Sequence, residues 1–276
     1  MSYNVKIIRT RSYIEIYEYG APIISGYKKD EKSKDEKLEI RAYDDITENE
    51  QLERLKRMAK TRQNAKWNLM RLIDSNFDDR TSFLTLTTKE NIESREIFND
   101  MFDKFITRFN YHFLHTKKRI LKYIATLEKQ ERGAYHAHIL LFDIGYLDHK
   151  ELTGVWGHGF VWINKLEKLD DSSNAGRYIG KYMEKGVGQE LLESKGKKAY
   201  YSSRNLKKPL IKKLLSNEDL SGIVEYNQSS VLYESEYTGK AFRNGKYVES
   251  AIKYRKIKLE RGEKSVSTTN TTKEIK

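Results

Sequence analysis

The stretch that decides the fold is ILKYIATLEKQERGAYHAHILLFD, residues 120–143. Two runs rich in aliphatic, β-branched and aromatic residues, 120–128 and 135–143, flank a short polar segment that contains Gly133. This pattern predicts two strands joined by a hairpin turn at the glycine.

His136 and His138 are separated by one residue within the second run. Because side chains alternate between the two faces of a strand, both imidazoles are expected to point to the same face. A turn centred near residues 131–132 places Glu128 opposite residues 135–136. The two imidazoles and this carboxylate can then complete a sulfur-free site for one divalent cation, which suits Mg²⁺ or Mn²⁺ working with phosphate oxygens. A purely structural role for the histidine pair stays open at this point.

The remaining elements follow from the spacing of apolar residues on either side of this hairpin. The expected elements, in chain order, are one or two strands within 3–19, a helix over 47–75 that begins at a capping box of Thr47 and Glu50, a strand at 83–87, a helix from about Ile92 to Leu114, a strand at 160–166, a helix from Asn174 to about Lys185, and a strand at 200–206.

The composition favours a nucleic-acid partner. The 276 residues include 52 Lys and Arg against 40 Asp and Glu, a net charge of +12, together with 19 Tyr, 10 Phe and 3 Trp. A positive field attracts polyanions, and aromatic rings mixed with cations suit single strands. The absence of cysteine excludes disulfides, thiolate metal sites and cysteine nucleophiles, and it favours the cytoplasm. No apolar run long enough to span a membrane and no secretory signal is found, so no membrane partner is expected.

A second candidate site lies in RYIGKYMEK, residues 177–185, where Tyr178 and Tyr182 are four residues apart. On a helix the two phenols share one face. A phenol has a pKa near ~10 and needs help to act as a nucleophile, and the ammonium of Lys181 favours the phenolate and can hold a phosphate. The same spacing is also typical of a packed amphipathic helix.

The order of these motifs resembles a known family. Phe83–Thr87 comes first, Glu128 with His136-Ala-His138 follows, and Tyr178-x-x-Lys181-Tyr182 comes last. This order is similar to the three motifs of the rolling-circle replication initiators of small plasmids and single-stranded DNA phages, the HUH endonucleases. The resemblance covers about residues 80–185, and the paired tyrosines resemble the two-tyrosine branch.

The resemblance implies a fold and a division of the chain. The fold class is α+β, with a central antiparallel sheet of about five strands flanked by helices. Residues 81–190 would form the endonuclease core, and residues 1–80 an N-terminal extension that joins it. Residues 191–260 would form a basic C-terminal region packed on the core, and residues 261–276 a disordered polar tail.

The resemblance also implies the chemistry of DNA nicking and strand transfer at an origin. Tyr178 would attack a phosphodiester of single-stranded DNA, keep a 5′-phosphotyrosine link and free a 3′-OH that primes a polymerase. Tyr182 would be the second nucleophile, for the closing strand transfer, and Lys181 would position the phosphate. Phe83–Thr87 would serve as sheet core.

The implied cofactor is a divalent metal, Mg²⁺ or Mn²⁺, bound by His136, His138 and Glu128, with Glu131 as a rival for the third ligand. The implied partners are origin DNA with a stem-loop, and a separate helicase and polymerase from a bacterial host cell, because no P-loop is found. Two other functions stay open: an HUH relaxase or transposase-type nickase of a mobile element, and a basic nucleic-acid-binding protein without enzymatic activity.

Three further groups of residues are interpreted more simply. His158 is expected in a glycine-flanked loop, as loop structure or a DNA contact. His112 and His115 are expected near a helix end, where capping or solvent exposure explains them. Tyr200 and Tyr201, with the basic residues that follow, fit either a clamp on single-stranded DNA or a plain strand.

Overall fold

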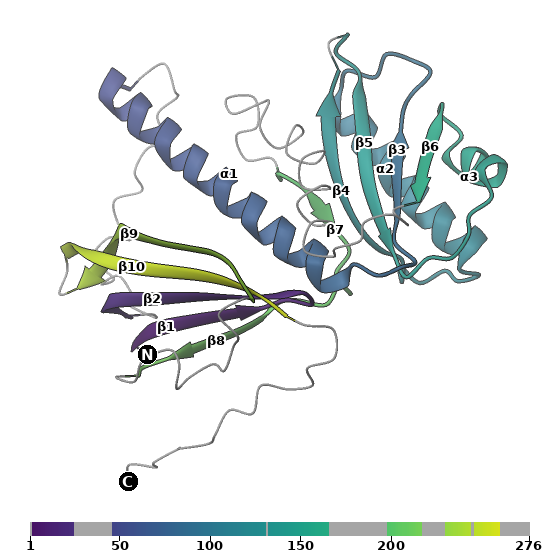
Figure 1. Ribbon diagram of the computed structural model, residues 1–276. Coiled ribbons are helices and arrows are strands. Elements are labelled where there is room, and N and C mark those ends of the chain that lie inside the picture. The colour runs from purple at the N-terminus through teal and green to yellow at the C-terminus, as the bar shows by residue number, and fades with distance from the viewer. Residues whose placement is uncertain are drawn as a thin grey trace. The chain divides into compact units, whose positions relative to one another are not determined.

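The computed structural model describes residues 2–24, 46–130, 132–165, 198–216, 230–243 and 246–259. Contacts divide the chain into two compact units, Arg41–Lys208 on the one hand and Met1–Ile40 with Pro209–Lys276 on the other. Each unit contains one antiparallel sheet of five strands, and three helices accompany them in the described residues (Figure 1). The predicted α+β class with an antiparallel five-stranded sheet is therefore confirmed.

The unit Arg41–Lys208 contains the sheet β6-β3-β5-β4-β7. The strands and helices of this unit are α1 (Glu48–Asn76), β3 (Ser82–Leu86), α2 (Arg95–Phe113), β4 (Lys122–Lys129), β5 (Tyr135–Phe142), α3 (His149–Trp156), β6 (Val161–Lys165) and β7 (Tyr201–Ser202). The strands and helices predicted between residues 47 and 166 are present within a few residues of their predicted bounds. The strand predicted at 200–206 is reduced to the two residues of β7.

The two faces of this sheet are covered by different helices, and β5 shows why. Ala137, Ile139 and Leu141 point to one face, where they join the large core cluster that also contains the apolar side chains of α2 and α3. Leu140 and Phe142 point to the other face, where a second cluster includes residues from the C-terminal half of α1. His136 and His138 share this second face because they have the same parity as Leu140.

The helix ends agree with the capping signals in the sequence. Thr47 and Glu50 form the predicted capping box, in which each side chain accepts a hydrogen bond from the backbone of the other. Ser94 caps α2 and Asp148 caps α3, each through a side-chain oxygen that accepts one backbone N–H group of the first turn. These caps satisfy N–H donors that would otherwise lack partners in the first turn.

The second unit contains the sheet β8-β1-β2-β10-β9. Its strands are β1 (Ser2–Arg9), β2 (Tyr13–Ile24), β8 (Leu210–Leu214), β9 (Val231–Arg243) and β10 (Lys246–Lys258). The first two confirm the strands predicted within 3–19, whereas the last three were not predicted. One face of this sheet carries an apolar cluster with Val5, Ile7, Ile14, Ile16 and Ile257 at its centre.

The domain boundaries expected from the sequence, at 80/81 and 190/191, stay predictions. Contacts between residues assign both ends of the chain to one unit, which consists of Met1–Ile40 and Pro209–Lys276. The helix predicted from Asn174 to about Lys185 and the polar tail at 261–276 lie outside the described residues. Within the described residues, no helix combines the length and apolar character that crossing a bilayer requires.

Candidate active site

The hairpin of β4 and β5 sets the register of the candidate site. Glu128 pairs with His136 across the two strands, as the position of the turn predicted. Gly133 lies in the turn with a φ of 88°, a conformation that residues with a Cβ rarely adopt. A Cβ on Gly133 would also lie 3.1 Å from the side chain of Glu93. The glycine therefore allows the tight turn that aligns the carboxylate with the histidines.

His138 is held on both edges of its ring. Its Nε2 lies 2.7 Å from Oε2 of Glu128, and its Nδ1 lies 3.2 Å from Oγ1 of Thr85 on β3. The ring also stacks on Phe83, with centroids 6.0 Å apart. Either ring nitrogen can donate or accept, so the contacts with Glu128 and Thr85 at opposite edges fix the orientation of the ring. The side chains of His138 and Glu128 are 14% and 22% exposed, so the pair is partly exposed.

His136 lies beside this pair with a different environment. Its Nε2 is buried and has no hydrogen-bond partner among the described residues. Burial lowers the pKa of His136 below its ordinary value, and the neighbouring His138 and Arg132 lower it further. The ring is therefore neutral near pH 7, which is the form that binds metal ions.

The three predicted metal ligands are only partly assembled. Glu128 and His138 are in contact, whereas His136 contributes an unsatisfied nitrogen on the same face. Among the described residues, no three His, Cys, Asp or Glu side chains are grouped so that they could hold one metal ion. The nitrogen and oxygen donors suit a hard or borderline divalent cation, and the geometry brings two of the three together.

Three further side chains share this face, which we call the histidine face and define by Thr85, Thr126, Glu128, His136, His138 and Trp162. Thr126 and Thr85 are each paired with His138 in register, and Trp162 on β6 is paired with Thr85. Trp162 is 66% exposed. Sequence reasoning missed Thr85 as a partner of His138 and missed Trp162, although the alternation of residues in 83–87 and 160–166 places both on a definite face.

The other predicted site residues lie outside the described residues. These are Tyr178, Lys181, Tyr182 and the rival ligand Glu131. Their assignment as nucleophiles, phosphate-binding group and alternative metal ligand stays a prediction.

Residues 81–187 match the family model of the replication-associated protein ORF2. The matched segment includes the histidine hairpin and the tyrosine motif. The chain is also 24% identical over 169 residues to the phasyl DNA replicon protein arp of Escherichia coli, an alignment that covers 51% of this chain and 56% of that protein. The chain therefore spans little more than half the length of this relative. No solved structure matches the chain.

Both comparisons support a replication initiator, the class that the order of motifs predicted. The match of the family model begins one residue before β3 and therefore covers the strands that carry the histidine face. The two-tyrosine branch stays a prediction.

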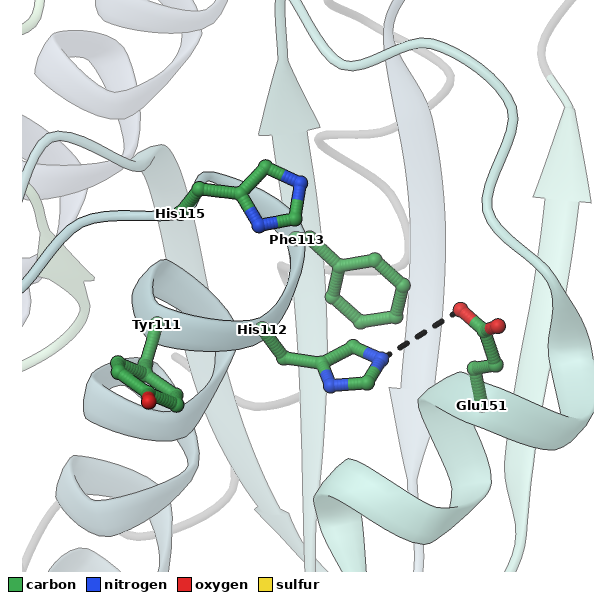
Figure 2. A pocket seen from close by; sticks show the side chains of 5 residues that line it. All are labelled: Tyr111, His112, Phe113, His115 and Glu151. Atoms are coloured by element: carbon green, nitrogen blue, oxygen red, sulfur yellow. Dashed lines mark hydrogen bonds and ion pairs between the residues drawn. The ribbon is translucent and has the colours of Figure 1, made fainter.

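His112 and His115 line a different hollow, of about 650 Å³, together with Tyr111, Phe113 and Glu151 (Figure 2). Nε2 of His112 lies 3.4 Å from Oε2 of Glu151, and both side chains are about half exposed. This hollow lies at the end of α2 and at α3, the helices that cover the opposite face of the sheet. The two histidines therefore contribute nothing to the histidine face, in agreement with their simpler interpretation.

The structure also bears on the interpretations of His158 and of Tyr201. The ring of His158 packs against Trp156, and its carbonyl accepts a hydrogen bond from the backbone of Lys89, so this residue orders its loop. The hydroxyl of Tyr201 donates to Asn99 on α2, and its ring packs on Phe102. This favours the plain strand for Tyr201 over a clamp on DNA.

Proposed function

We propose that this protein initiates rolling-circle replication by nicking single-stranded DNA at an origin and joining the strand again through phosphotyrosine. The observation that carries the proposal is the Glu128–His138 pair, which is partly exposed, beside the buried and unsatisfied nitrogen of His136, within the segment similar to replication-associated proteins. The net charge of +12 supports a polyanionic substrate.

In the proposed reaction the phenolate oxygen of Tyr178 attacks the phosphorus of one phosphodiester. A bond from this oxygen to phosphorus forms, the bond from phosphorus to the 3′ oxygen breaks, and the 3′ oxygen takes up a proton. One ester replaces another, so no nucleotide cofactor is needed to drive the step. The freed 3′-OH primes a polymerase, and a separate helicase from the host opens the duplex.

Tyr182 is proposed to carry the second cleavage, in which its oxygen attacks the phosphorus of a regenerated origin phosphodiester and releases a new 3′-OH. This 3′-OH attacks the phosphorus held by Tyr178, the bond from phosphorus to the Tyr178 oxygen breaks, and the DNA closes. Lys181 is proposed to hold the scissile phosphate beside both phenols. A second nucleophile allows the closing step while the first oxygen is still occupied as an ester.

The histidine face is proposed to hold Mg²⁺ or Mn²⁺ through His136, His138 and Glu128. A cation bound there polarises the phosphoryl oxygen and offsets the charge that develops during attack. Thr85 orients the ring of His138 from its other edge, as the groups behind metal-binding histidines do in general. Glu131 stays the rival third ligand.

The experiment that tests the function uses a labelled single-stranded oligonucleotide that carries a stem-loop from the DNA flanking the coding sequence. With Mn²⁺ or Mg²⁺ the full chain should cut one bond and form a protein–DNA adduct that survives denaturant, and a chelator should stop both. Salt-sensitive binding without any adduct would indicate the non-enzymatic alternative. Cutting at full rate in chelator would contradict the metal site.

Trp162 leads to a prediction about substrate binding. Its exposed ring lies two strands from His138 on the same face, about 10 Å away at the backbone, which is close enough to stack a base beside the scissile phosphate. We expect Trp162→Ala to raise the KM for the oligonucleotide about five- to hundredfold with little change in kcat. Steady-state nicking kinetics measure both values.

Two variants control this prediction. Trp162→Phe keeps an aromatic ring and should keep most of the affinity. Tyr111→Ala removes a ring that is 67% exposed on α2, away from the histidine face, and should leave the KM unchanged. Equal effects of Trp162→Ala and Tyr111→Ala would contradict the stacking role.

A further inference from the structure

The sheet of the second unit has one face that is dominated by tyrosine. Strand pairing places these tyrosines on the same side, opposite the apolar cluster of this sheet. We call it the tyrosine face and define it by Tyr3, Tyr13, Tyr17, Tyr19, Tyr233, Tyr237 and Tyr254.

Five of the rings form a continuous series across four strands. The ring centroids are 5.8 Å apart for Tyr3 and Tyr19, and 6.5 Å apart for the parallel rings of Tyr19 and Tyr17. The series continues from Tyr17 to Tyr254 at 4.9 Å, and from Tyr254 to Tyr233 at 6.0 Å. It therefore crosses from β1 through β2 and β10 to β9.

Lysine ammonium groups lie over the rings of the same face. Lys213 is 4.8 Å from the ring centroid of Tyr3, and Lys6 is 5.6 Å from that of Tyr17. Lys256 is 3.7 Å from the centroid of Tyr13. These distances are within the range of cation–π contacts, and they place positive charge between aromatic surfaces.

Four of the five acidic side chains in these strands lie off this face. In the five strands, the register places Glu18, Glu234, Glu236 and Glu249 on the opposite face, where Arg255 pairs with the first two. Glu15 is the acid on the tyrosine face, where it is almost fully buried and accepts a hydrogen bond from the hydroxyl of Tyr254. The accessible charge of the tyrosine face is therefore positive.

We propose that the tyrosine face binds single-stranded DNA, with bases stacked on its exposed rings and phosphates beside the lysines. Rings interleaved with cations are the combination that holds single strands without reading their sequence. Tyr233 and Tyr237 are 57% and 46% exposed, so their rings are available to bases. The choice of DNA rests on the proposed function, and the tyrosine face would hold a part of the strand other than the scissile phosphate.

The first test measures affinity for a labelled oligothymidylate by fluorescence anisotropy with the full chain. We expect the double variant Tyr233→Ser/Tyr237→Ser to raise the Kd about tenfold or more, because each ring stacks a base. The double variant Tyr233→Phe/Tyr237→Phe keeps both rings and should bind like the wild type. Tyr146→Ser, which removes a tyrosine that is 80% exposed in the other unit, is the matched control and should also bind like the wild type.

The second test uses the salt dependence of the same affinity. Lys213 lies on the tyrosine face, and its neighbour Lys212 lies on the opposite face of β8. Lys213→Gln should reduce the slope of log K against log salt by about 0.7, the value for one phosphate contact on a single strand. Lys212→Gln should leave the slope unchanged.

The outcomes separate this proposal from the proposed function. An unchanged Kd of the double serine variant overturns the proposal for the tyrosine face, even if the protein nicks DNA normally. That result would indicate a protein as the partner of this face. A raised Kd that the phenylalanine pair restores supports the proposal, even if no nicking is found. Equal slopes for Lys212→Gln and Lys213→Gln would overturn the phosphate contact.

Discussion

Replacing His138 with alanine is expected to lower the rate of nicking about a thousandfold or more, because it removes the ring nitrogen that contacts Glu128 at the proposed metal site. His138 is in contact with Glu128 and Thr85 at its two nitrogens, so no neighbour can take over both contacts. Nicking rates at increasing Mn²⁺, together with direct titration of Mn²⁺ binding, measure the loss.

Two threonines on the histidine face give matched controls for His138. Thr85→Val removes the hydroxyl that contacts Nδ1 and should weaken Mn²⁺ binding or nicking about ten- to hundredfold. Thr126 is the other register partner of His138, and its buried hydroxyl has no hydrogen-bond partner among the described residues. Thr126→Val should therefore leave nicking unchanged. A His138→Ala variant that nicks at the wild-type rate would contradict the site.

The hairpin that carries the histidines could be predicted from the sequence because its information is local. Alternating apolar residues in 120–128 and 135–143 indicate two strands, and Gly133 supplies the positive φ that the turn requires. A turn of known position fixes the register, so the pairing of Glu128 with His136 follows from counting residues. The capping box at Thr47 was predictable for the same reason.

The second sheet could not be predicted in the same way because its pairing is long-range. β2 pairs with β10, so that Tyr17 lies beside Tyr254 although more than two hundred residues separate them. No local pattern specifies such a partner. The hairpin of β9 and β10 did have a local signal, since the dipeptide Asn244–Gly245 between two alternating runs favours a tight turn.

The candidate site shows the same division between local and long-range information. Period-two alternation places His136, His138 and Glu128 on one face, but it does not orient the side chains. Orientation depends on Thr85, which belongs to a strand about fifty residues earlier and contacts His138 only after the sheet has formed. Sequence reasoning therefore found the donors but not the group that holds the ring of His138.

The division of labour between the two tyrosines gives the other large expected effect. Tyr178→Phe should lower the rate of initial cleavage at least about ten-thousandfold, because it removes the attacking oxygen and keeps the ring. Tyr182→Phe should keep initial cleavage and impair the closing strand transfer, because only the second nucleophile is lost. Gel assays of cleavage and of strand joining on the same oligonucleotide measure the two steps separately.

Peptide mapping of the DNA-linked tyrosine decides between the two assignments. Tyr178 and Tyr182 are about one turn apart on the predicted helix, so we expect both phenols on one face and either of them as a candidate for the attack. An adduct on Tyr178 in the wild type, and on the same residue in Tyr182→Phe, is the expected result. An adduct found only on Tyr182 would make Tyr182 the primary nucleophile instead. Normal strand joining by Tyr182→Phe would show that Tyr178 serves both steps, because Tyr178 is then the remaining phenol of the motif.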